Sequence, residues 1–290
     1  MATVIGVGIA AVDIINFTDG FPREDEEVRA VRQEIRRGGN TANTLVVLSQ
    51  LGHRCYWLGT VSDDLNSTVI MNDLAAHHVD TSGCELINKG KTPTSYITLN
   101  QRNGSRTIVH YRDLPELSSA SIYNAPLEDA HWIHFEGRNV ENTKQMLDYA
   151  KQHRPQLPVS IEIEKPRDQL ELLFPGADVY FFSRAFAGKQ NFTSAAALLR
   201  HYRQTVPQAL LVCSWGDEGA YALAQDKLLF APAPHIDSVV DTIGAGDTFN
   251  AGFIDARLNG SEVSTALQKA CALAAKKCSM EGFAGLANDR

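Results

Sequence analysis

The middle of the chain alternates between segments with strand periodicity and segments with helix periodicity, and this alternation constrains its fold most strongly. Runs rich in β-branched and aromatic residues predict strands over 131–135, 158–164, 179–182 and 209–214. The polar and apolar runs between them predict helices over 142–153, 168–174 and 193–204. Strands joined through helices form right-handed βαβ units on a parallel sheet. We therefore predict an α/β fold with a mostly parallel sheet covered by helices.

Two β-rich segments, at about residues 12–37 and 94–111, do not fit this alternation. The second contains Asn103-Gly104 between two strand-like runs, which is typical of a hairpin. We expect these segments to form a small separate β-sheet lid on the core. The 290 residues show no internal repeat and no linker, so a single domain over residues 1–290 is predicted.

The charge and the cysteines exclude several classes of protein. The formal charge is −7, from 27 Lys and Arg against 34 Asp and Glu, which argues against nucleic-acid binding. The five cysteines contain no Cys-x-x-Cys pair, so neither a disulfide framework nor a zinc site is indicated. No apolar run approaches the roughly 20 residues of a membrane helix, and the first residues lack the profile of a signal peptide. We expect a cytoplasmic protein without a membrane partner.

A glycine pair near the N-terminus offers one alternative function. Gly6-Val7-Gly8-Ile9-Ala10-Ala11 matches the loose Gly-x-Gly-x-x-Ala pattern of NAD-binding folds. That pattern requires a helix after the glycines, whereas residues 12–15 are mostly β-branched and apolar, apart from Asp13, and have no helical face. The sequence therefore argues against an NAD oxidoreductase.

The segment Gly244-Ala245-Gly246-Asp247 carries the clearest chemical signal. Small residues at the start of a predicted helix over 245–258 leave several backbone N–H groups free, and with the helix dipole these groups bind anions. A carboxylate beside such a site suits phosphoryl transfer, in which Asp247 accepts the proton of an attacking hydroxyl group. Alternatively, Asp247 serves only as an N-cap. At a helix N-terminus, we expect its pKa to be lowered.

Two motifs in the expected order carry a family resemblance. Asp241-Thr242-Ile243-Gly244-Ala245-Gly246-Asp247 resembles the C-terminal signature of the ribokinase-type (PfkB) carbohydrate kinases. Arg37-Gly38-Gly39-Asn40-Thr41-Ala42-Asn43 resembles their N-terminal glycine-rich signature. The resemblance covers the whole chain. It implies a ribokinase-like three-layer α/β/α core with a β-sheet lid, the use of ATP and Mg²⁺, a K⁺ dependence that is frequent in the family, and a homodimer formed through the lid.

Shorter sequence segments resemble the ketohexokinase branch of this family. Three of them are Asn103-Gly104-Ser105-Arg106-Thr107-Ile108-Val109, Glu136-Gly137-Arg138-Asn139 and Glu164-Lys165-Pro166-Arg167. This likeness implies phosphorylation of a keto-hexose, fructose to fructose 1-phosphate. The alternatives are a kinase of ribose, of a keto-deoxy sugar acid or of a nucleoside, and, in another class, a catalytically silent protein that binds a sugar or nucleotide. A sugar acid would require a basic residue in the pocket, for which Arg138 is the obvious candidate.

The resemblance also assigns roles by position. It implies that sugar hydroxyls bind Asp13, Gly39, Asn40 and Asn43, although the same residue types also suit caps and turns. Ser105 stands where ketohexokinases carry a sugar-contacting Asn. Residues Gly244, Ala245, Gly246 and Asp247 correspond to the anion hole and base. ATP is expected at these four residues and at Arg106, Gly216, Asp217, Glu218, Gly219 and Cys278. Glu164 is a candidate for a water-mediated Mg²⁺ contact, or else for an ion pair with Lys165 or Arg167.

Overall fold

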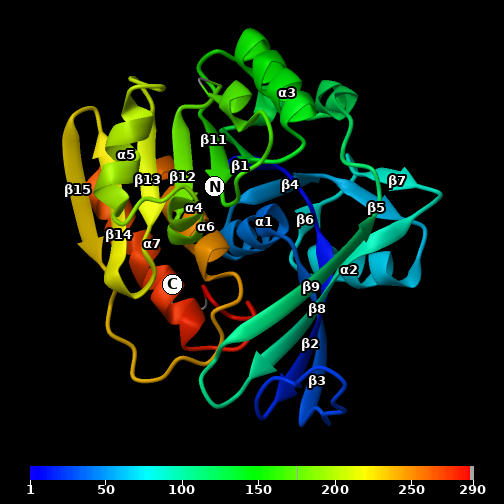
Figure 1. Cartoon of the computed structure of the whole chain (residues 1–290). Coiled ribbons are helices and arrows are strands. Elements are labelled where there is room, and N and C mark those ends of the chain that lie inside the picture. Colours follow the sequence, from blue (N-terminus) through cyan, green and yellow to red (C-terminus); the bar gives the residue numbers. More distant parts are fainter. Residues whose placement is uncertain (175, 288–290) are drawn as a thin grey trace.

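The computed structural model describes residues 1–174 and 176–287, which form a large sheet covered by helices and a smaller sheet beside it (Figure 1). The strands of the large sheet are β1 (Thr3–Val7), β4 (Arg54–Leu58), β6 (Val79–Asp80), β10 (Trp132–Glu136), β11 (Val159–Ile163), β12 (Val179–Ser183), β13 (Leu210–Ser214), β14 (Gly219–Ala224) and β15 (Lys227–Pro232). Their order is β15-β14-β13-β12-β11-β10-β1-β4-β6. Neighbours from β6 to β13 are parallel, and β14 and β15 pair antiparallel. The predicted mostly parallel core is confirmed.

Helices cover both faces of this sheet and make the fold three-layered. They are α1 (Asn40–Gln50), α2 (Leu65–Ala76), α3 (Val140–His153), α4 (Arg184–Lys189), α5 (Ala195–Arg203), α6 (Ala245–Leu258) and α7 (Val263–Cys278), with 3-10 turns η1 (Ser119–Asn124), η2 (Leu127–Asp129), η3 (Leu170–Leu173) and η4 (Gly216–Glu218). Successive strand residues point to opposite faces. Ile5 therefore packs in one hydrophobic cluster with Leu147 of α3, and Val4 in the other with Leu45 of α1. None of the helices in the described ranges is long and apolar enough to cross a membrane.

The smaller sheet is built from the two segments that did not fit the alternation. Its strands are β2 (Ala11–Thr18), β3 (Arg32–Gly38), β8 (Lys91–Asn100) and β9 (Arg106–Asp113), in the order β3-β2-β8-β9. The β8–β9 and β2–β3 pairs are antiparallel, whereas β2 and β8 run parallel. Figure 1 shows this sheet standing away from the large one. A separate two-stranded sheet pairs β5 (Thr60–Ser62) with β7 (Glu85–Ile87).

Two local expectations differ from the structure. The helix predicted over 168–174 is wrong, because only the short turn η3 forms there. Gln169 precedes it with a φ of 60°, in the left-handed region, and Phe174 after it is extended. A regular helix cannot run through either conformation. Conversely, α4 was not expected, and its start is capped by Ser183, whose hydroxyl accepts a hydrogen bond from the Phe186 N–H at 3.0 Å.

Because the central strands are parallel, their carboxyl ends meet at one edge of the large sheet. The carboxyl ends of β1, β10, β11, β12 and β13 all reach this edge. Side chains at the ends of these strands, and in the loops that follow, therefore come together although they are far apart in the sequence.

Candidate active site

Two adjoining cavities lie at this edge of the large sheet. The first, of about 480 Å³, is lined by residues of the smaller sheet and by residues at or after the ends of β10, β11, β12 and β13. The second, of about 560 Å³, is lined by residues that follow β13 and β15 and by α6 and α7. Ser214, Thr242, Ala245 and Gly246 line both cavities. These four residues mark a junction where ligands in the two cavities would meet.

The start of α6 is a candidate anion-binding site at this junction. Gly244 is the N-cap with a φ of 78°, a conformation that favours glycine. A Cβ on Gly244 would also lie 2.3 Å from the Phe283 ring. Among the described residues, the backbone N–H groups of Gly244, Gly246 and Asp247 have no hydrogen-bond partner. Free N–H groups at a helix N-terminus bind anions, as the motif predicted.

Asp247 is not the N-cap of this helix. It is the third residue of α6, and its side chain, 6% exposed, accepts a hydrogen bond from Asn43 Nδ2 at 2.6 Å. The expected lowering of its pKa is wrong. Burial raises the pKa of Asp247 to about 7, and the negative charges of Glu164 and Glu136 add to this rise. A carboxylate with a pKa near neutrality is well matched to a general base.

A second buried carboxylate lies beside Asp247. Glu162, at the end of β11, accepts hydrogen bonds from Asn40 Nδ2 at 2.9 Å and from Asn250 Nδ2 at 3.0 Å. Burial, and next the charge of Asp247, raise the pKa of Glu162 well above its usual range. Glu164 accepts from Asn40 Nδ2 at 3.2 Å, so the two glutamates share one amide. This pairing fixes the side chain of Asn40 beneath the first cavity.

The four residues expected to bind sugar all line the first cavity. Gly39 caps α1 with a φ of 103°, and a Cβ there would lie 2.4 Å from the carbonyl oxygen of Ile9. Glycine at this position lets the backbone of α1 approach the end of β1. Asp13 lies in β2, and burial raises its pKa, against the hydrogen bond from Ser95. Asn40 and Asn43 are the first and fourth residues of α1, on one face of the helix.

Arg106 and its neighbour Ser105 are placed differently. Arg106 begins β9 and lines the first cavity, and its Nη1 donates to the hydroxyl of Thr242 at 2.7 Å. It therefore connects the smaller sheet to the loop that precedes α6. Ser105, expected at the sugar, lines neither cavity. Its side chain is exposed and donates to Asn103 Oδ1 at 2.6 Å, because the tight β8–β9 turn holds it against its own loop.

Most residues expected at the nucleotide line the second cavity or the junction. Gly216, Asp217, Gly219 and Cys278 line the second cavity, while Glu218 lines neither. Burial raises the pKa of the Cys278 thiol, so it stays protonated at neutral pH and serves as a packing group.

The metal expectation rests on one residue. Within residues 1–174 and 176–287, no group of three His, Cys, Asp or Glu side chains is arranged to hold a metal ion. Glu164 has a side chain that is 39% exposed, lines the first cavity and lies 3.5 Å from Lys165 Nζ. An exposed carboxylate suits an ion such as Mg²⁺, which retains waters and takes few protein ligands.

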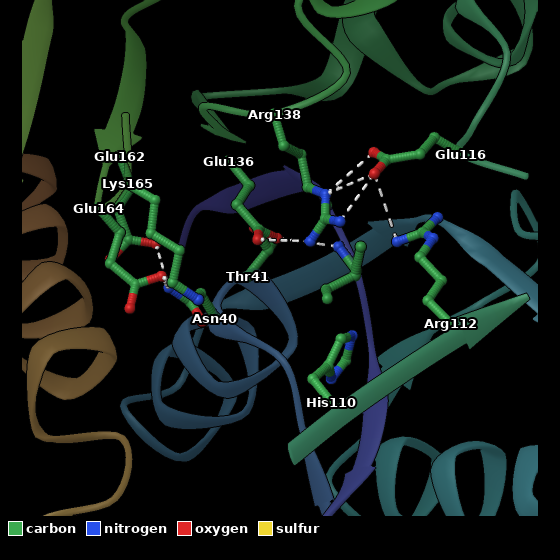
Figure 2. A network of polar contacts seen from close by, with 12 residues as sticks. Asn40, Thr41, His110, Arg112, Glu116, Glu136, Arg138, Glu162, Glu164 and Lys165 are labelled. Atoms are coloured by element: carbon green, nitrogen blue, oxygen red, sulfur yellow. Dashed lines mark hydrogen bonds and ion pairs between the residues drawn. The ribbon is translucent and has the colours of Figure 1, made fainter. Parts of the chain in front are cut away.

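Sequence reasoning missed Glu136, Asn250, His110 and Arg112 at the site, whereas Arg138 was the basic residue expected for a sugar-acid pocket. Arg138 lies between Glu136 and Glu116 and lines the first cavity, and His110 and Arg112 of β9 also line it (Figure 2). Glu136, at the end of β10, was detectable, because the ends of parallel strands carry functional side chains. Asn250 was detectable as well, because it lies three residues after Asp247 on the same helix face. No local signal pointed to His110 or Arg112.

Comparison with known proteins agrees with this geometry. The family described as "pfkB family carbohydrate kinase" matches residues 1–288. The chain is 39% identical to ketohexokinase of Mus musculus, over 98% of each chain, and 26% identical to ribokinase of Bacillus subtilis, over 92% of this chain and 90% of the other. Its fold is that of Arabidopsis thaliana ribokinase, solved with ribose and ATP, at a TM-score of 0.81 and 20% identity, over 97% of this chain and 94% of the other.

Proposed function

The chain belongs to the pfkB family of carbohydrate kinases, and from this premise we propose that it transfers the γ-phosphoryl group of ATP to a hydroxyl group of a keto-hexose, as in fructose to fructose 1-phosphate. One observation carries the proposal. The buried carboxylate of Asp247 lines the first cavity next to the junction residues Ala245 and Gly246, on the same helix turn as the unpaired N–H groups of Gly244 and Gly246. A base and an anion site at one point are the two elements that phosphoryl transfer needs.

In the proposed reaction, the sugar binds in the first cavity and ATP in the second. Asp247 removes the proton of the acceptor hydroxyl as that oxygen attacks the γ-phosphorus in line with the leaving ADP oxygen. The N–H groups of Gly244, Gly246 and Asp247 donate hydrogen bonds to the oxygens of the transferred group. Arg106, held against Thr242, adds positive charge from the lid. Most of the rate enhancement comes from positioning and charge stabilisation.

Two observations support a keto-hexose as the sugar. Asp13, Asn40 and Asn43 supply both donors and acceptors to a polyol. The 39% identity to a ketohexokinase over nearly the whole chain favours a keto-hexose. Ribokinase is among the related enzymes, so ribose is the second candidate.

We include Mg²⁺ in the proposal, with Glu164 contacting it through water. Bound Mg²⁺ would neutralise phosphate charge, and the half-exposed carboxylate of Glu164 fits that role. The K⁺ dependence stays a prediction, which assays in KCl and in NaCl test.

We also propose a cytoplasmic homodimer formed through the smaller sheet. Ile35, Ile14, Tyr96 and Val109 are register neighbours across β3, β2, β8 and β9. Ile35, Tyr96 and Val109 are 56%, 49% and 66% exposed, which makes an apolar row on this sheet. The five cysteines are free, as is usual in a reducing compartment.

A coupled assay of ADP release tests the proposed function. The panel contains fructose, ribose, a keto-deoxy sugar acid and adenosine, each with ATP and Mg²⁺. We expect sugar-dependent ADP release with a higher kcat/KM for fructose than for ribose or adenosine. Sugar binding in calorimetry without ADP release from any acceptor would instead indicate a silent binding protein.

A further inference from the structure

The first cavity contains a concentration of basic side chains that the proposed mechanism does not use. This basic set is His110, Arg112, Arg138, Lys165 and Arg167, and all five line the cavity. They come from three separate segments: β9, the loop after β10 and the loop after β11. Figure 2 shows Arg112 and Arg138 next to Glu116, and His110 on the same strand as Arg112. Lys165 lies beside Glu164 and Asn40 (Figure 2).

Arg138 is held rigidly with its charge at the cavity. Its Nε and Nη2 donate to Glu116 at 2.9 and 2.7 Å, and its Nη1 donates to Glu136 at 3.1 Å. Glu116 does not line the cavity, so it holds Arg138 from behind. A guanidinium fixed by a carboxylate outside the cavity is preorganised to bind a ligand inside it.

Arg112 presents an unused donor. Its Nε and Nη2 donate to the carbonyl oxygens of Leu114 and Pro115 at 2.9 and 3.2 Å, which fixes the guanidinium plane. Its Nη1 is buried and has no hydrogen-bond partner in the structure, although Glu116 lies 3.5 Å away. A buried N–H group without an acceptor is costly, so Arg112 gains if its guanidinium turns toward a ligand acceptor in the cavity.

Five carboxylates also line the cavity, those of Asp13, Glu136, Glu162, Glu164 and Asp247, and of these Glu136 and Glu164 pair with the basic set. The side chain of Arg167 forms no hydrogen bond or ion pair with any residue of the described part of the chain, and the side chain of Lys165 pairs with Glu164 at 3.5 Å. The basic set also acts on His110: burial, and then the charges of Arg138, Lys165 and Arg112, lower its pKa. The oxygens of a neutral sugar can accept hydrogen bonds from these donors, but an anionic group accepts stronger, charge-assisted ones.

We propose that the acceptor of this kinase carries an anionic group, a carboxylate or a phosphate, which binds the basic set while the hydroxyl to be phosphorylated lies at Asp247. The inference rests on the proposed function and narrows its substrate class to acidic derivatives of a keto sugar. Arg112 and Arg138 would bind the anion with charge-assisted hydrogen bonds, and Arg167 and Lys165 would add attraction.

Three ketoses that differ only at carbon 6 test this proposal: fructose, fructose 6-phosphate and fructuronate, with a hydroxymethyl, a phosphate and a carboxylate group respectively. We expect kcat/KM for at least one anionic ketose to exceed that for fructose by roughly 100-fold, as one or two charge-assisted hydrogen bonds supply. The comparison of fructose 6-phosphate with fructuronate shows whether the site prefers a phosphate or a carboxylate. High salt should reduce the advantage of the anionic sugar, because ions screen exposed charges such as Arg167.

Substitutions connect this preference to the basic set. Arg112→Gln and Arg167→Gln should each lower the ratio of anionic to neutral kcat/KM by about tenfold or more. The matched control is Arg200→Gln, an exposed arginine of α5 that lines neither cavity, and it should leave the ratio unchanged.

The outcomes separate this inference from the proposed function. The inference is overturned if fructose is phosphorylated as efficiently as both anionic ketoses, or if Arg112→Gln and Arg167→Gln keep the ratio of anionic to neutral kcat/KM. The basic set is then only a structural network, and the proposed kinase function is unaffected. If no ketose releases ADP, the proposed acceptor class is wrong. Calorimetry with fructose 6-phosphate then decides the inference alone: binding that Arg112→Gln abolishes supports it, and absence of binding to the unmodified protein overturns it.

Discussion

The ammonium nitrogen of Lys277 lies 3.1 Å from Asp241 Oδ2 and 3.0 Å from the carbonyl oxygen of the same residue. Lys277 is fully buried, and Asp241 stands directly before the loop that leads to the anion-binding site. Burial lowers the pKa of Lys277, and Asp241 opposes this by favouring the charged ammonium. The ion pair between the buried Lys277 ammonium and the buried Asp241 carboxylate therefore fixes the backbone at the start of that loop.

Removal of this ammonium should destabilise the protein. Lys277→Met leaves the Asp241 carboxylate buried with Arg36 as its remaining charged partner, at 2.8 Å. Breaking a buried ion pair costs roughly 3–5 kcal/mol, and Arg36 should keep the loss near the lower end. Urea denaturation measures the free energy of unfolding. Lys144→Met, which removes an exposed pair with Asp148 on α3, should change it by less than about 0.5 kcal/mol.

Asp247→Asn should lower kcat by roughly a hundredfold to ten-thousandfold, because the amide cannot accept the proton of the sugar hydroxyl. Sugar binding, measured by calorimetry, should persist, since Asn43 and Asp13 remain in the cavity. Asp148→Asn, on the exposed face of α3, is the matched control and should keep full turnover. Unchanged kcat in Asp247→Asn would remove Asp247 from the role of base.

The pH profile should report the raised pKa of Asp247. Below about pH 7 this carboxyl group is protonated in the folded protein and cannot act as a base, so kcat/KM should rise through that pH and level off above it. Glu164→Gln removes a negative charge that raises the pKa of Asp247, so the rise should move to lower pH. Glu128→Gln, whose side chain is 88% exposed, should leave the profile in place. A profile that does not move in Glu164→Gln would contradict this coupling.

Arg106→Gln should weaken the contact between the smaller sheet and the loop before α6. The variant loses the donor to the Thr242 hydroxyl and a positive charge at the junction of the cavities. We expect kcat to fall by about tenfold or more, with a higher KM for ATP. Arg102→Gln is the control, because Arg102 pairs with Asp19 at the exposed tip of the same sheet. Equal kinetics in the two variants would argue against a catalytic contribution from Arg106.

Val109→Glu should convert the proposed homodimer to a monomer. A charge at this 66% exposed position of β9 would be buried without a partner if the apolar row forms the interface. Sedimentation measures the change in mass. Leu86→Glu, on β7 and 60% exposed, introduces the same charge outside the smaller sheet and should remain dimeric. A monomeric unmodified protein would contradict the dimer itself.

The parts of the fold that sequence analysis predicted correctly are those with local signals. The strand and helix periods between residues 131 and 214 matched β10 to β13, α3 and α5, because one face of each element must be apolar to pack. Asn103-Gly104 marked the β8–β9 turn for the same local reason. The helix over 168–174 failed because the left-handed Gln169 has no signature in composition.

By itself, the sequence determined the helix start at Gly244 to Asp247 with its free N–H groups, since small residues at a helix start leave these groups free wherever that helix lies. Only the tertiary structure decided the pKa of Asp247, because burial by other elements outweighs the local helix terminus. It also decided that Ser105 stays outside the first cavity and that Arg112 and Arg138 line it. Residues from distant segments reach one cavity only when whole strands pair in the right register, and no short stretch of sequence encodes that pairing.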